Sequence, residues 1–430
     1  GISAFRMVDN DVEMGVDEVG EESSEVFIPG KSRTDGNEEL ECDESAYVLY
    51  HQAQTGAPCL SFDVVHDQLG NNRNQFPATC YIVAGTQAPQ THLNNLMIIK
   101  FSNLTQTKLN ENDGEDSDED SDDDSETAEL DFAVIEHQGC VNRVKTTEIN
   151  NVHLAATWSE LGKVFIWSLD DGLNATDDHI VMTNYMRLGK NETKPLSTFT
   201  GHKCEGYGLD WSTLKPGHLA SGDCDKNIHL WKPLEGGKWA VDQRPYLSHT
   251  ASVEDIQWSP NEAEVFASCS VDKTIKIWDA RAPPHQACML TTTDAHDSDV
   301  NVISWNKNEP FILSGGDDGK LKVWDLREFQ GGKPVALFKH HTAPISTVEW
   351  HPLDSTVFAA GGSDNQITQW DLAVEKDEEN QEGLQDIPPQ LLFIHQGQDD
   401  IKELHWHPQI PGLVISTAQS GFNVFKTISV

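Results

Sequence analysis

The chain has 430 residues, of which 37% are hydrophobic and twelve are tryptophan, and its formal net charge is −40. This length exceeds that of most single cores and predicts two domains or one array of repeats. Most of the charge is local, because segments 1–44, 111–131 and 375–386 together carry −29 and leave −11 for the remainder. Such a charge disfavours direct binding to nucleic acid or to an anionic membrane, and it favours a basic protein partner.

The cysteines and the apolar runs bear on the cellular compartment. The eight cysteines form no Cys-x-x-Cys pair, and several lie in strand-like runs, which is typical of a reducing compartment. No apolar run approaches the length of a membrane span, and the first residues do not resemble a signal peptide. We therefore expect an intracellular monomer without disulfide bonds.

The N-terminal part of the chain divides into two segments. Residues 1–40 are acidic and poor in apolar side chains, which predicts disorder. Residues 41–57 predict a helix, because Tyr47 and Tyr50 share one face at helical spacing and Asp43 can cap its N-terminus.

From residue 58 to residue 430 the sequence consists of repeats, and the clearest unit is 249–281. A tryptophan ends the third strand of five units, at 167, 231, 278, 324 and 370, and recurs in steps of mostly 45 to 47 residues. In four units an aspartate precedes this tryptophan by six residues and follows a histidine by 22 or 23 residues. The four sets, three of them with a serine between, are His202, Ser221, Asp225 and Trp231; His249, Ser268, Asp272 and Trp278; His296, Ser314, Asp318 and Trp324; and His341, Asp364 and Trp370.

Because these residues recur together at fixed spacing, they indicate a buried hydrogen-bond network around the indole rather than a catalytic triad. The pattern resembles the WD-repeat family. Three degenerate units, 58–101, 137–167 and 395–425, bring the total to seven four-stranded blades. The fold class expected is therefore all-β, a seven-bladed propeller with an N-terminal helix and acidic insertions at 111–131 and 375–390. A strand near the N-terminus, whose position the repeats do not fix, should complete the last blade.

The segment 111–126 is the strongest candidate for a binding element. It carries eleven acidic residues in sixteen and follows the third strand of the first unit, so it cannot fold alone and attracts cationic surfaces. The alternative is a solubilising spacer. Three serines followed by acids are candidate phosphorylation sites: Ser117, Ser121 and Ser125. The candidate client-binding residues are Glu111, Asp113, Glu115, Asp116, Asp118, Glu119, Asp120, Asp122, Asp123, Asp124 and Glu126.

The segment 43–55 followed by PCLSFD, together with an acidic insertion that ends in Pro-Pro, resembles the retinoblastoma-binding histone chaperone branch of WD-repeat proteins. The resemblance implies a groove between the N-terminal helix and the insertion that binds an amphipathic histone helix. The alternative is a helix that only packs on the last blade. The groove residues implied are Tyr47, Tyr50, Glu378, Glu379, Asp386 and Pro389.

The acidic insertion in the first unit, with the stretch RNQFPATCYIVAGTQA, narrows the resemblance to the glutamate-rich WD-repeat family. That resemblance implies a nuclear and nucleolar chaperone. Its clients would be a newly made basic large-subunit ribosomal protein of the L-three type and histones, during ribosome biogenesis.

Two further sets of residues are candidate protein contacts. Six acids near the starts of first strands predict an acidic rim: Glu205, Glu254, Asp255, Asp299, Asp399 and Asp400. The runs Trp278-Asp-Ala-Arg281 and Trp324-Asp-Leu-Arg327 resemble the W-D-x-R pattern of substrate receptors of cullin–RING ubiquitin ligases. The alternative is that each arginine pairs with the neighbouring aspartate. We find no phosphate-binding loop and no metal-ligand spacing, and we expect neither enzyme activity nor a cofactor.

Overall fold

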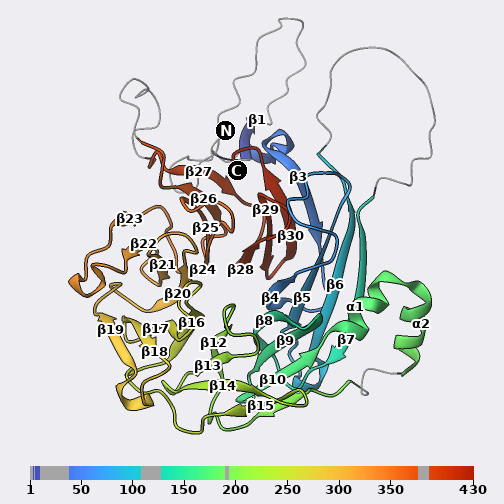
Figure 1. Ribbon diagram of the computed structural model, residues 1–430. Coiled ribbons are helices and arrows are strands. Elements are labelled where there is room, and N and C mark those ends of the chain that lie inside the picture. The colour runs from blue at the N-terminus through green and yellow to red at the C-terminus, as the bar shows by residue number, and fades with distance from the viewer. Residues whose placement is uncertain (1–2, 4, 10–37, 108–126, 189–192, 376–386) are drawn as a thin grey trace, which may run out of the picture.

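The computed structural model describes residues 3, 5–9, 38–107, 127–188, 193–375 and 387–430. Seven four-stranded antiparallel sheets form a closed ring, seen along its axis in Figure 1. The predicted seven-bladed propeller is confirmed. In the part of the chain that the structure describes, no helix is long and apolar enough to cross a membrane.

The strands of each blade run from the ring centre outward, first to fourth. Blade 1 contains β4 (Cys59–Val65), β5 (Ala78–Thr86), β6 (Asn95–Leu104) and β7 (Glu129–Glu136). Blade 2 contains β8 (Val141–Ile149), β9 (Val152–Ser159), β10 (Lys163–Ser168) and β11 (Ser197–Phe199). Blade 3 contains β12 (Gly206–Trp211), β13 (Leu219–Asp223), β14 (Ile228–Leu234) and β15 (Lys238–Val241). Blade 4 contains β16 (Val253–Trp258), β17 (Val265–Ser270), β18 (Ile275–Asp279) and β19 (Cys288–Thr292).

The remaining blades follow the same plan. Blade 5 contains β20 (Val300–Trp305), β21 (Phe311–Gly316), β22 (Leu321–Asp325) and β23 (Ala336–Phe338). Blade 6 contains β24 (Ile345–Trp350), β25 (Val357–Gly362), β26 (Ile367–Asp371) and β27 (Leu391–His395). Blade 7 contains β28 (Ile401–Trp406), β29 (Leu413–Ala418), β30 (Gly421–Thr427) and, from the N-terminal side, β3 (Tyr47–Ala53). Outside the ring lie β1 (Phe5–Asp9), β2 (Glu38–Cys42), α1 (Asp170–Asp177) and α2 (His179–Leu188).

The predicted helix at 41–57 is wrong, because the centre of this segment forms β3, the strand that closes the ring. Only Glu44–Ala46 is helical, as one 3-10 turn. β3 pairs with β30 in antiparallel register, and a bulge shifts that register between Tyr47 and Leu49. The bulge turns Tyr47 and Tyr50 toward the same side, where their rings stack 4.9 Å apart, while Leu49 enters the opposite cluster. The three-residue spacing that suggested a helix therefore arises from a bulged strand.

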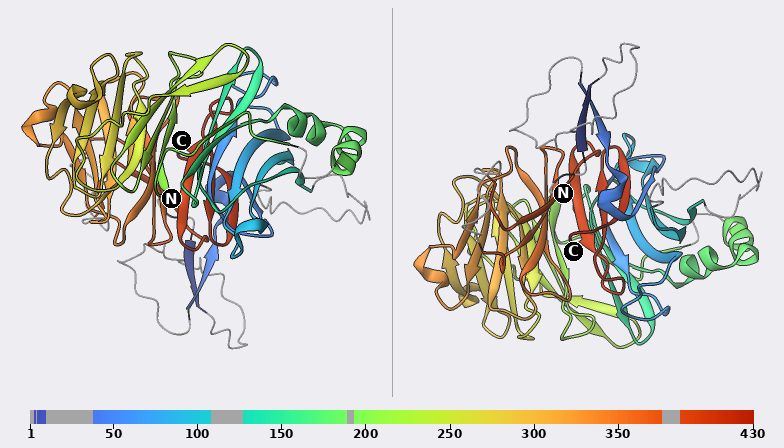
Figure 2. Two further views of the ribbon diagram at one scale, coloured as in Figure 1. Left: turned by 90° about the horizontal axis from the view of Figure 1, so that it is seen from below. Right: turned by 90° about the horizontal axis from the view of Figure 1, so that it is seen from above.

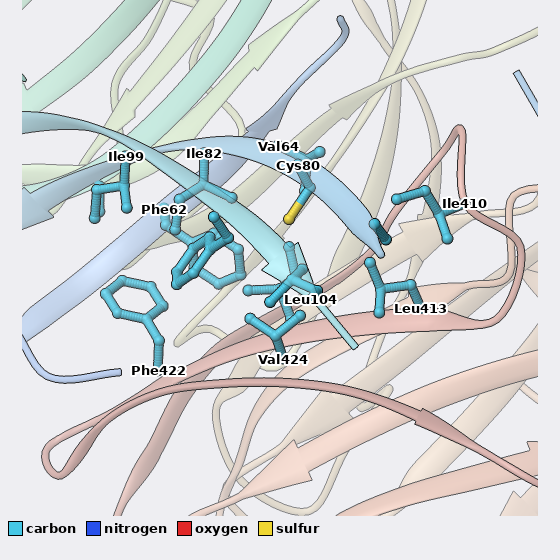
Figure 3. Close-up of a cluster of buried hydrophobic side chains, with 14 of the residues drawn as sticks. Phe62, Val64, Cys80, Ile82, Ile99, Leu104, Ile410, Leu413, Phe422 and Val424 are labelled. Carbon is cyan, nitrogen blue, oxygen red and sulfur yellow. The ribbon is translucent and has the colours of Figure 1, made fainter. Parts of the chain in front are cut away.

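The core at the closure consists of apolar side chains from both ends of the ring. Figure 3 shows Phe62 and Ile82 of blade 1 beside Phe422 and Val424 of blade 7. These side chains are at most 1% exposed. Closure therefore buries apolar surface between segments that are far apart in the sequence.

The segment 1–40 is not wholly without structure. β1 and β2 pair antiparallel, and Ser3 bridges to Ile394 beside blade 6. The prediction of disorder is wrong for these residues, and residues 10–37 lie outside the described part.

Within the blades, three of the four predicted networks are confirmed. The His249 ring contacts Asp272 Oδ2 at 2.9 Å and Ser268 Oγ at 2.7 Å, and the Trp278 indole donates to the same hydroxyl. The sets in blades 5 and 6 are closed in the same way, with Thr368 supplying the hydroxyl in blade 6.

In blade 3 the aspartate assignment needs correction. His202 contacts Asp223 Oδ2 at 2.7 Å, and Asp225 donates its backbone N–H to Asp223 Oδ1. Asp223, the last residue of β13, contacts the imidazole of His202 directly. The turn residue Asp225 therefore does not pair with this histidine.

Two degenerate blades lack the aspartate and use another group in its place. In blade 2, Nδ1 of His137 contacts the carbonyl of Gly139, while Thr157 Oγ1, at the serine position, contacts Nε2 of His137 and accepts from the Trp167 indole. In blade 7, the hydroxyl of Tyr47 lies 2.6 Å from Nδ1 of His395 and takes the place of the aspartate. Burial lowers the pKa of His395 to about 3, so this ring is neutral at pH 7.

The first strands of the blades are joined by a belt of side-chain hydrogen bonds. At six junctions a side chain accepts a backbone N–H from the next blade, over 2.6 to 3.1 Å. The pairs, acceptor first, are Asp63 and Thr146, Asp210 and Trp258, Asp255 and Ile303, Ser304 and Trp350, Glu349 and Trp406, and Glu403 and Phe62. At the seventh junction the Trp211 indole donates to the carbonyl of Lys145.

Strand alternation divides the ring into two faces. Every first strand begins on one face, the upper face, and every connection from a third to a fourth strand lies on the other, the lower face. The three long connections, 105–128, 169–196 and 372–390, are all of this second kind. Their ends therefore meet the ring on its lower face.

The connection 169–196 contains the two helices, which the sequence analysis did not predict. They pack beside blade 1, at the side of the ring (Figure 2). Gly172 permits this contact, since a Cβ there would lie 2.1 Å from Ile98 Cδ1. The helices are only 8 and 10 residues long, and they interrupt a sequence whose repeats indicate strands, so their own helical pattern is weak.

We predict that Tyr47→Phe destabilises the ring. The substitution keeps the apolar contacts of Tyr47 but leaves the buried Nδ1 of His395 without its partner, a loss of about 1–3 kcal/mol. Urea unfolding measures the change. Tyr246→Phe is the matched control, because the Tyr246 hydroxyl makes only a 3.5 Å contact with Ala280. Equal midpoints for both variants would contradict the role of Tyr47.

Candidate protein-binding surfaces

The predicted acidic rim is present in part on the upper face. Asp399 is exposed, Asp400 pairs with Lys402 at 2.6 Å, and Glu205 accepts from Asn142. Asp255 is a correction: it is 4% exposed and accepts the N–H of Ile303 within the belt. It is therefore structural and not part of the surface.

Three carboxylates gather where blades 4 and 5 meet. Burial raises the pKa of Glu254, and Asp299 and Asp317 raise it further against the opposing effect of Arg143. Burial likewise raises the pKa of Asp299, with Asp317 contributing. Carboxylates that repel one another in this way are stabilised by an added cation. The rim as a contact for a basic partner stays a prediction.

The channel below the rim contains paired charges. Arg143 contacts Glu403 at 2.9 Å, and although burial opposes ionisation, Arg143 lowers the pKa of Glu403. Burial also opposes protonation of His405, but Glu349 and Glu403 outweigh it and raise its pKa to about 10. The charges of the channel are thus partly neutralised.

The predicted groove between a helix and the Pro-Pro insertion is not formed as expected. Tyr47 is buried, its ring 5.5 Å from that of Phe393, and is unavailable to a partner. Tyr50 is half-buried beside it, and Pro389 is exposed in the turn before β27. The other residues implied for this groove lie outside the described residues: Glu378, Glu379 and Asp386.

The acidic run 111–126, with Ser117, Ser121 and Ser125, also lies outside the described residues. The structure places its two flanks between the third and fourth strands of blade 1, as the sequence predicted. Its acids and its phosphorylation sites stay predictions.

The two arginines of the W-D-x-R pattern lie on neighbouring blades. Arg281 and Arg327 are 70% and 69% exposed, and each forms a two-bond pair with the aspartate two residues before it. This is the local pairing that the sequence analysis gave as the alternative. Arg244 pairs with Asp242 in the same manner.

Two hollows were not found by sequence analysis. One, of about 430 Å³, lies beside α1, and each of its three carboxylates has a partner: Asp67 pairs with Arg73, Asp170 with His153, and Asp177 with Tyr81 and Lys100. The second, of about 530 Å³, lies on the outside of the ring, where Gln54–Ala57 of the connection from blade 7 meets blade 1. Both join residues far apart in the sequence, so no local pattern could reveal them.

Comparisons with known proteins agree with this architecture. The family model described as WD domain, G-beta repeat matches residues 193–232, 243–279, 287–325 and 332–371. A second family model, which describes the histone-binding protein RBBP4 and its counterpart in the CAF1 complex, matches residues 37–105.

Three curated relatives align over 94% of this chain. Glutamate-rich WD repeat-containing protein 1 of Dictyostelium discoideum is 42% identical, with 84% of its own length covered. The chain belongs to the glutamate-rich WD-repeat family. Ribosome assembly protein rrb1 of Schizosaccharomyces pombe is 43% identical, with 84% of its own length covered. Protein HEAT STRESS TOLERANT DWD 1 of Arabidopsis thaliana is 42% identical with 92% covered.

We predict that Asp210 makes the stability of this family member fall as pH rises toward neutrality. Burial raises its pKa from the ordinary 3.8 to about 7, against the opposing effect of Lys145. Between these values the folded protein keeps a proton that the unfolded chain releases, so raising the pH favours unfolding. Asp210→Asn removes this titration and can still accept the N–H of Trp258.

The measurement is the free energy of unfolding at pH 5 and pH 8. The Asn variant should gain stability relative to wild type on going to pH 8. Asp297→Asn serves as control, since Lys320 lowers the pKa of Asp297 and both states are ionised over this range. A constant difference between wild type and Asp210→Asn at the two pH values would contradict the assignment.

Proposed function

We propose that this protein is a ribosome-assembly chaperone that binds a basic, newly made large-subunit ribosomal protein of the L-three type, and also histones. Family membership supports the first part, since one relative is named a ribosome assembly protein. The histone-binding description of the model that matches residues 37–105 supports the second. The expected location is the nucleus and the nucleolus.

The observation that carries the proposal is the uneven distribution of charge. Of the net −40, the segments 1–44, 111–131 and 375–386 hold −29, while the channel of the ring pairs its charges internally. A rigid ring whose long connections carry many carboxylates attracts a basic client over long range and neutralises it. The rim residues Glu254 and Asp299 add a second acidic region on the upper face.

We predict that the acidic run 111–126 supplies most of the salt-sensitive affinity. Changing its eleven carboxylates to amides should weaken binding of a purified L-three-type ribosomal protein at least about tenfold at low salt, and should flatten the salt dependence. Isothermal titration over a salt series measures both. The control replaces Ser117, Ser121 and Ser125 with alanine, which alters the same segment without changing its charge. Unchanged salt-sensitive binding in the amide variant would refute the proposal.

A second candidate function is that of a substrate receptor of a cullin–RING ligase. The observation that favours it is the exposure of Arg281 and Arg327 on adjacent blades. Alanine at both positions should abolish pull-down of the ligase adaptor. Arg244→Ala is the matched control, because Arg244 is 76% exposed and forms the same local pair. If the double variant retains the adaptor as well as the control does, this function is excluded.

A further inference from the structure

The hollow of about 530 Å³ between blades 7 and 1 is an uncharged, largely apolar groove. Its outer wall is β7, whose residues Leu130, Phe132 and Val134 share one face by strand alternation. Its floor includes Met97 and Ile99 of β6, which stand opposite Val134 and Phe132 in the register. None of the residues that line it is charged. A volume of this size accommodates one or two large side chains.

Several apolar side chains of this groove remain in contact with solvent. Phe132 is 48% exposed, Leu130 37% and Leu93 51%. Three large apolar residues exposed at one concave site are unusual for a surface that has no partner. By contrast, the side chains on the other face of β7, Ala133 and Ile135, are buried in the core.

The acidic connection is attached at the lower end of this groove. On one side, the N–H of Thr107 donates to the carbonyl of Val48 in β3, at 3.0 Å. On the other side, Asn103 Nδ2 donates to the carbonyl of Thr127, just before β7 begins. At the β7 end, Thr127 therefore stands three residues before Leu130, which lines the groove.

One exposed carboxylate borders the groove. Glu136 shares the face of β7 that carries Leu130, Phe132 and Val134, and it stands opposite the lining residue Asn95 in the register, whereas β7 carries no lysine or arginine. An apolar hollow bordered by a carboxylate complements an apolar side chain with a basic neighbour. A purely acidic client segment would be repelled, and a purely basic one would leave the hollow unfilled.

We propose that this groove binds a large apolar side chain of the basic client, while Glu136 contacts a lysine or arginine that flanks that side chain. The inference rests on the proposed function, since it assumes a basic client. It deepens that function, because charge alone does not distinguish one basic protein from another and an apolar anchor does. The wall formed by β7 lies outside residues 37–105, which match the histone-binding family model.

The test uses two lysine-rich peptides of equal length and charge, one with a central Leu-Leu pair and one with Ser-Ser. Wild-type protein should bind the leucine peptide about tenfold more tightly, because the groove removes apolar surface from water. The double variant Leu130→Ser, Phe132→Ser should lose this preference and still bind both peptides. The matched control is Ile180→Ser, Met186→Ser, which changes residues that are 73% and 72% exposed on α2, away from the groove, and should keep the preference.

Fluorescence anisotropy measures all the affinities, and circular dichroism confirms that the variants are folded. Equal binding of the two peptides to wild-type protein overturns the inference, and so does a preference that survives in the groove variant. The wild-type comparison decides the question even where a variant fails to fold. If neither peptide binds wild-type protein at low salt, the proposed function itself fails, so the two failures are distinguishable.

Discussion

The pairing of β3 with β30 is the constraint on which the rest of the structure depends. Each blade buries its faces only against its neighbours, so an open array would expose the sides of blades 1 and 7. Residues 47–53 supply the fourth strand of blade 7 and hold the two ends of the chain together. Tyr47 adds the hydroxyl that the last histidine network lacks, and Glu403 joins the first strands of blades 7 and 1. One short strand therefore closes the sheet, the network and the core.

The sequence predicts the repeated part of this protein well and the exceptions poorly, for physical reasons. Recurrent tryptophans and histidines identify the blades, because the buried indole and imidazole nitrogens of each blade need hydrogen-bond partners at the same positions. Tyr47 and Tyr50 mimic a helix because a bulge, invisible in the sequence, sets their spacing. Asp225 occupies the position at which the other repeats have the aspartate of the network. In this blade, however, Asp223 is the residue that contacts the histidine. The rim shows the same limit, since spacing cannot tell the buried Asp255 from the exposed Asp399.

The division of the ring into two faces organises its function. The long connections leave on the lower face, whereas the carboxylates of the rim lie on the upper face. The groove that we propose for an apolar side chain of a basic client lies on the outside of the ring. The ring itself contributes rigidity, because its belt and its networks join the blades through buried hydrogen bonds. Specificity is then left to the connections and to the few surfaces that the repeats leave open.

Hydrogen–deuterium exchange of the complete protein tests the central claim, closure by the N-terminal strand, most directly. If β3 completes blade 7, its amides that pair with β30 exchange as slowly as those of β29, although the segment lies near the beginning of the chain. Rapid exchange throughout residues 47–53, with β28 to β30 still protected, would contradict the account, because the ring would then be closed by other means.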